Sequence, residues 1–234
     1  MSDQRALNFL PDDLTYDEWV IFIFDHPILE PNWWWWDADS PNFKFWDEEA
    51  DPARTLSFLT KLFQESGQLL LRFTDWQIDQ GLNYIVSNSC SNHMYSLTNG
   101  SLPWEDRKAC FDAMIVLYRD LMAPVYGSDP DRLTIRVGPE RPTFSCYMWW
   151  DVMPIHGGLD TPDGKMNTAI LNVFNQVLQM DQLCCLESAL HGLGHWQLFV
   201  GDRVSPIIER FLARTDISDT IRQYAIDAGN GNFQ

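Results

Sequence analysis

Apolar residues recur every three or four positions along most of the chain, which is the pattern of amphipathic α-helices. In residues 104–122, for example, Phe111, Met114, Ile115 and Tyr118 fall on one helical face. The same pattern predicts helices over 15–26, from Pro52 onward, and over 74–88, 104–122, 166–180, 183–198, 203–214 and 218–228. The sequence therefore predicts an all-α fold.

Capping residues support several of these boundaries. Asp51 followed by Pro52 is typical of an N-cap with proline at the first helical position. Pro27 is expected to end the first helix, because the residue before a proline avoids helical backbone angles. Asp216 or Ser218 is expected to cap the last helix.

Residues 123–165 lack a clear period and contain six prolines and five glycines. We expect them to connect two helical halves of the protein. A connection of this length in a compact domain either contains short helices or is functional. Residues 146–152 are a candidate short helix, and the alternating residues 133–137 are a candidate strand.

The most specific local pattern is Ser188-Ala-Leu-His-Gly-Leu-Gly194, followed after a break by Val204-Ser-Pro-Ile-Ile-Glu-Arg-Phe-Leu212. Over residues 183–213 the chain resembles one unit of the HEAT-like helical repeats. The resemblance implies a curved stack of helix pairs and a role in protein binding. One such pair must stack on neighbours to bury its apolar face.

The expected fold is thus a single domain over 1–234, an irregular HEAT-like stack with a proline- and glycine-rich central connection. Its parts are an acidic, tryptophan-rich segment over 1–52, helices over 53–122, the connection 123–165, and HEAT-like helices over 166–234.

Charge narrows the range of partners. The chain has 33 acidic and 16 basic residues, a net charge of −17, and residues 1–52 hold 13 of the acids with two bases. Such a field repels phosphate backbones, which argues against nucleic-acid binding. It would speed association with a basic protein, whereas the alternative is a charge that serves solubility alone.

Four consecutive tryptophans stand in this acidic segment, and some indole surface is expected to face solvent or a partner. Tryptophan is a frequent interface anchor, and the surrounding acids would select a basic partner. Alternatives are a tryptophan cluster buried in the core, or rings that stack on a sugar. The candidate partner-binding residues are Trp33, Trp34, Trp35, Trp36, Asp37, Asp39, Trp46, Asp47, Glu48 and Glu49.

A second candidate site is the stripe of Glu187, His191 and His195, which are spaced four apart on one helix. Two histidines at this spacing can bind zinc, with Glu187 or His156 as a third ligand. Alternatively, both histidines line a ridge between helices and bond to neighbouring backbone groups or acids. Gly192 and Gly194 favour this alternative, because glycine inside a helix suggests close approach of a neighbouring helix or ring.

Other chemistry has little support in the sequence. The five cysteines, Cys90, Cys110, Cys146, Cys184 and Cys185, form no CxxC pair and are expected to be reduced and buried. Phosphate-binding glycine loops and serine nucleophile motifs do not occur. Without a signal peptide or a membrane-spanning stretch in the sequence, we expect a cytoplasmic protein that binds neither membrane nor nucleic acid.

The sequence thus favours a non-enzymatic protein-binding module without a cofactor. The expected role is that of an inhibitor or immunity-type protein, which neutralises a basic effector such as a nuclease toxin. The alternatives are a metal-dependent hydrolase that uses Glu187, His191 and His195, or a scaffold or adaptor protein.

Overall fold

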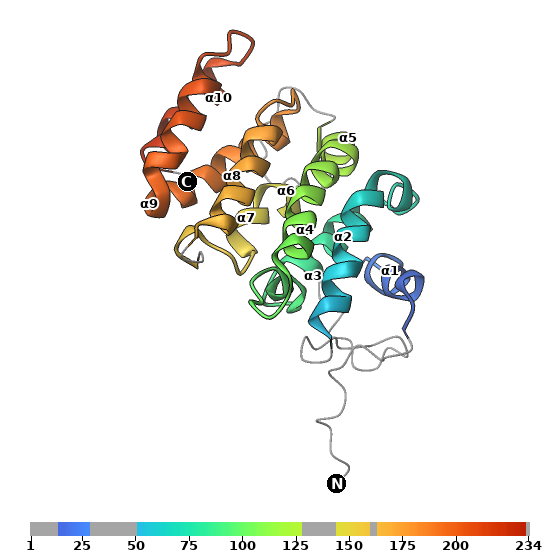
Figure 1. Ribbon diagram of the computed structural model, residues 1–234. Coiled ribbons are helices and arrows are strands. Elements are labelled where there is room, and N and C mark those ends of the chain that lie inside the picture. The colour runs from blue at the N-terminus through green and yellow to red at the C-terminus, as the bar shows by residue number, and fades with distance from the viewer. Residues whose placement is uncertain (1–13, 29–50, 128–143, 160–162, 233–234) are drawn as a thin grey trace.

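The computed structural model describes residues 14–28, 51–127, 144–159 and 163–232, and all regular structure in these ranges is helical, as expected (Figure 1). A π-helical segment, Tyr118–Met122, joins α4 to α5. Short 3-10 helices cover His93–Leu97 and Gly157–Leu159. The α-helices are α1 (Tyr16–Phe24), α2 (Pro52–Leu69), α3 (Asp75–Val86), α4 (Trp104–Leu117), α5 (Ala123–Tyr126), α6 (Phe144–Tyr147), α7 (Trp149–Val152), α8 (Lys165–Val177), α9 (Leu183–Leu212) and α10 (Asp219–Gly229).

Side-chain caps begin several of these helices. Asp51 accepts hydrogen bonds from two backbone amides at the start of α2, with proline at the first helical position, as the sequence predicts. Ser218 rather than Asp216 caps α10. Thr15 and Thr74 form capping boxes at α1 and α3, so local sequence fixes where these helices begin.

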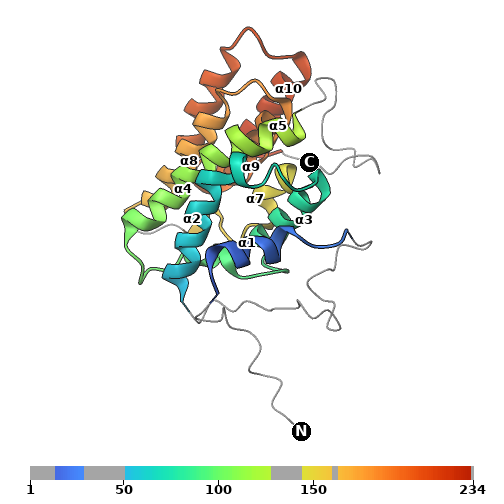
Figure 2. The ribbon, with the colours of Figure 1, turned by 90° about the vertical axis from the view of Figure 1, so that its right-hand side faces the viewer.

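The helices pack in two rows. One row contains α2, α4 and α8, each of which contacts the next. The other contains α1, α3, the short helices α6 and α7, and the first half of α9. Figures 1 and 2 show the two rows running side by side, with α10 against α9 at the far end from α1.

Helix α9 is two helices joined at Val200, whose backbone angles (φ −136°, ψ 42°) are not helical. The first half runs antiparallel to α8, since Trp196 bonds to Asn167 and Gly192 lies against Phe174. The second half runs parallel to α8, since Arg203 bonds to Thr168 and Arg210 to Asn175. The chain therefore reverses at Val200, close to the break predicted between 183–198 and 203–214.

The central connection contains α6 and α7, so the short helix expected over 146–152 is confirmed as two helical turns. The candidate strand 133–137 lies outside the described residues. The buried apolar side chains of both rows form one cluster, in which Trp19, Trp149 and Trp196 are among the largest side chains. Among the described residues, no helix has the length and apolar character needed to cross a membrane.

Candidate metal centre

Three side chains from two helices converge at the junction of α7 and α9. The Nε2 atoms of His191 and His195, one helical turn apart on α9, lie 3.3 Å from each other. His191 Nε2 lies 2.8 Å from Asp151 Oδ2, and His195 Nε2 contacts Asp151 Oδ1. All three residues present a possible ligand atom within 4.8 Å of the others, which is the spacing of a mononuclear metal site.

Aromatic packing positions the carboxylate. Trp150, the residue before Asp151, is buried with its ring 4.5 Å from Phe174 and 5.8 Å from Trp196, both edge to face. These rings fix the short helix α7 against α8 and α9. A Cβ at Gly192 would lie 2.4 Å from Phe174 and 2.8 Å from Trp150, so only glycine allows this approach. The ring contact predicted from Gly192 is therefore confirmed.

The site is mostly buried, and Asp151 and His195 are its more exposed members. The exposed side-chain fraction is 6% for His191, 21% for Asp151 and 28% for His195. Burial raises the pKa of Asp151, but hydrogen bonds to the two histidines outweigh that effect and hold this pKa well below its usual range. An aspartate carboxylate beside two imidazoles is a combination of ligand types that transition-metal ions bind.

Two tyrosines lie behind His191. The hydroxyl of Tyr224, on α10, is 2.8 Å from His191 Nδ1, and the Tyr147 ring centroid is 4.6 Å from that of His191. Burial, followed by the Tyr147 phenol and the Glu187 carboxylate, raises the pKa of Tyr224 far above its usual value. Tyr224 thus remains a protonated phenol.

An apolar rim borders the site. Phe199 follows His195 by one helical turn, so both side chains lie on the same side of α9, and Phe199 is 51% exposed. Its ring is 5.3 Å from the imidazole of His156. Leu198 and Leu159 are exposed as well.

The sequence predicted two of the three residues in this cluster, His191 and His195, but not Asp151. His191 and His195 come together as predicted, but neither proposed third ligand joins them. Glu187 is buried near the two tyrosines instead, and His156 packs on Phe199. Asp151 was missed because it lies in the connection, 40 residues before His191, where no helical period relates the two positions.

The other predicted sites have different outcomes. All ten candidate partner-binding residues, between Trp33 and Glu49, lie outside the described residues. All five cysteines are free, and all but Cys90 are buried. Cys184 and Cys185 lie near Cys146 in the core, with Sγ atoms of the adjacent pair 3.8 Å apart.

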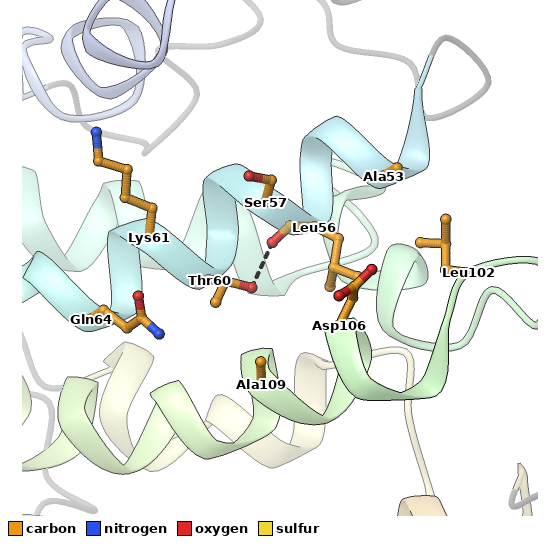
Figure 3. Close-up of a pocket in the computed structure, with 9 residues that line it drawn as sticks. All are labelled: Ala53, Leu56, Ser57, Thr60, Lys61, Gln64, Leu102, Asp106 and Ala109. Carbon is orange, nitrogen blue, oxygen red and sulfur yellow. Dashed lines mark hydrogen bonds between the residues drawn. The ribbon is translucent and has the colours of Figure 1, made fainter.

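A separate pocket of about 390 Å³ lies between α2 and α4 (Figure 3). Leu56, Leu102 and Ala109 give it an apolar floor, and Lys61 and Asp106 stand at its edges. Thr60 turns its hydroxyl to the carbonyl of Leu56 rather than into the pocket. This pocket presents no group of converging metal ligands or nucleophiles, so the three-residue cluster is the better candidate site.

Comparisons of the chain with protein-family models, curated proteins and solved structures gave no match.

Proposed function

We propose that the protein binds one divalent transition-metal ion through Asp151, His191 and His195, and that it is a metal-dependent hydrolase. The observation that carries the proposal is the convergence of two imidazole nitrogens on one ionised carboxylate. Three protein ligands with one open position are typical of catalytic zinc sites, whereas structural zinc sites have four.

The types of ligand atom support zinc in particular. Imidazole nitrogens favour zinc over magnesium or calcium, which prefer oxygen ligands. The two Nε2 atoms lie 3.3 Å apart, close to the separation of two ligands at a tetrahedral angle. The contacts of Asp151 with both imidazoles are hydrogen-bond distances, so the carboxylate would have to move outward to admit an ion.

The hydrolase proposal depends on a coordination position that the three protein ligands leave free. A zinc ion held by these three residues would have a coordination position left for a water molecule. Zinc lowers the pKa of such a water to about 7, which supplies a hydroxide nucleophile at neutral pH.

Metal content tests the binding step. Tag-free protein, purified without chelator, should contain about one zinc per chain and bind added zinc with a Kd below about 10 µM by calorimetry. His191→Ala, His195→Ala and Asp151→Ala should each abolish stoichiometric binding. His156→Ala is the matched control, because it removes a nearby histidine outside the cluster. Zinc-free wild-type protein that does not take up the metal would refute the proposal.

The hydrolytic step has its own test. Zinc-loaded protein should cleave at least one nitrophenyl carboxylate or phosphate ester, and removal of zinc or His195→Ala should lower the rate by at least about a hundredfold. Zinc binding without any ester cleavage across such a panel would leave a metal-binding protein and refute the hydrolase.

Protein binding is the second candidate function, and the two-row packing of helices favours it. We propose that the two halves of α9, joined at Val200, form one HEAT-like pair. The acidic, tryptophan-rich segment would bind a basic effector, such as a nuclease toxin, in the cytoplasm. The combined substitutions Asp47→Lys, Glu48→Lys and Glu49→Lys should then strongly slow association with the basic effector at low salt. An unchanged association rate would contradict this role.

A further inference from the structure

The C-terminal helix α10 reaches the metal site through one side chain. Its other described contacts are mainly with the second half of α9. Arg222 bonds to the carbonyls of Leu212 and Arg214, and Gly229 lies against Ile208. Tyr224 instead reaches His191 in the first half of α9, at 2.8 Å from Nδ1. Helix α10 thus bridges the two halves of α9 beside the candidate ligands.

The hydrogen bond behind His191 suits a metal-bound histidine. A histidine that binds a metal through Nε2 carries its hydrogen on Nδ1, and a partner at Nδ1 fixes the ring. The Tyr224 oxygen, 2.8 Å from Nδ1, is placed to accept this hydrogen. The ring of Tyr147 also packs on the imidazole, at 4.6 Å between centroids. His191 is therefore held with Nε2 directed at Asp151 and His195.

We infer that Tyr224 is a positioning residue for the metal ligand His191, so that metal binding and the docking of α10 on α9 stabilise each other. This inference rests on the proposed metal site and adds a device by which that site is regulated. Among the described elements, α10 packs mainly on α9, and an element with few tertiary partners opens locally more readily than the core does. Opening of α10 removes the Nδ1 partner and weakens the site, and a bound metal holds α10 closed by the same factor.

Zinc affinity of the full-length, tag-free protein tests the positioning role. Tyr224→Phe keeps the ring and removes the hydroxyl that contacts His191, and should weaken zinc binding about 10- to 100-fold. Tyr95→Phe is the control, because Tyr95 is an exposed tyrosine on the 3-10 helix His93–Leu97. Tyr224→Phe that binds zinc within about threefold of the wild type would overturn the inference.

Hydrogen exchange separates this role from a purely structural one. Zinc should slow amide exchange over Asp219–Gly229 in the wild type, and this protection should shrink strongly in Tyr224→Phe at zinc concentrations that saturate both proteins. Equal protection of α10 by zinc in the wild type and in Tyr224→Phe would overturn the coupling. Amide exchange of α10 that zinc does not change in the wild type would overturn it as well. If the wild type binds no zinc at all, the proposed metal site is wrong. If the wild type and Tyr224→Phe bind zinc equally well, only the positioning role of Tyr224 is wrong.

Discussion

At the scale of single residues, Gly192 shows how a residue without a side chain determines where the candidate ligands lie. Phe174 and Trp150 occupy the space that a Cβ would take, and Trp150 in turn sets the position of Asp151. A glycine inside a helix lowers stability by about 1 kcal/mol relative to alanine. Close ring packing over this position compensates for that cost.

Gly192→Ala is therefore expected to destabilise the protein, although alanine is the better helix former. The added methyl group would push two buried rings apart, and overpacking of this kind costs about 1–3 kcal/mol. Urea unfolding measures the effect. Gly100→Ala is the matched control, because nothing lies within 4 Å of a Cβ at that position. Equal or greater stability of Gly192→Ala would show that the rings yield easily.

Asp79 is a buried acid on α3 that hydrogen-bonds to two residues far apart in the sequence, Tyr126 and Ser145. Its carboxylate accepts hydrogen bonds from the Tyr126 hydroxyl at 3.0 Å and the Ser145 amide at 2.9 Å. Burial raises its pKa from 3.8 to about 6, and the hydrogen bonds oppose this shift only in part. The folded state thus binds the Asp79 proton more tightly than the unfolded state does.

Asp79 should therefore make the protein more stable as the pH falls from about 7 to about 4. With two pKa units at about 1.4 kcal/mol each, the contribution is on the order of 3 kcal/mol. Asp79→Asn mimics the neutral form and removes this dependence. Urea unfolding of both proteins across this pH range isolates the effect: the free energy of unfolding of the wild type, minus that of the variant, should decrease as the pH rises through 6. A difference independent of pH would contradict the raised pKa.

At the scale of helices, the sequence predicted those features that depend on residues close together along the chain. The caps at Asp51 and Ser218 and the helical periods predicted nearly every described helix. The pairing of His191 with His195 followed from the same period. Asp151 did not, because its place depends on the packing of Trp150 against α8 and α9. The periodic signal of a helix does not reach across a connection of 43 residues.

Arg214 connects two helices: it follows the end of α9 and hydrogen-bonds to the chain at the end of α8. Its guanidinium donates to the carbonyls of Leu178 and Met180, at 2.7 and 3.2 Å, where α8 has no further helical partners. Arg214→Ala should cost about 1–3 kcal/mol in urea unfolding. The control Arg210→Ala removes a single exposed bond to Asn175 and should change stability by less than about 0.5 kcal/mol. Equal effects would assign no special role to the carbonyl contacts.

At the scale of the whole molecule, the acidic charge exceeds what the bases can neutralise. Even if each of the 16 lysines and arginines paired with an acid, 17 of the 33 acids would remain. The ion pairs Lys61–Glu65, Lys108–Asp112 and Lys165–Asp163 are about half exposed and contribute little. The sequence thus carries an excess of negative charge, and self-repulsion of like charges opposes a compact state.

Added salt should consequently stabilise the protein. Raising NaCl from about 10 mM to about 100 mM shortens the Debye length from about 30 Å to about 10 Å, which screens the repulsion between distant carboxylates more than contacts between paired charges. The thermal midpoint should rise over this range and then level off, whereas an uncharged osmolyte at equal osmolarity should not reproduce the curve. A midpoint that fell with NaCl would mean that attractive ion pairs outweigh the excess acids.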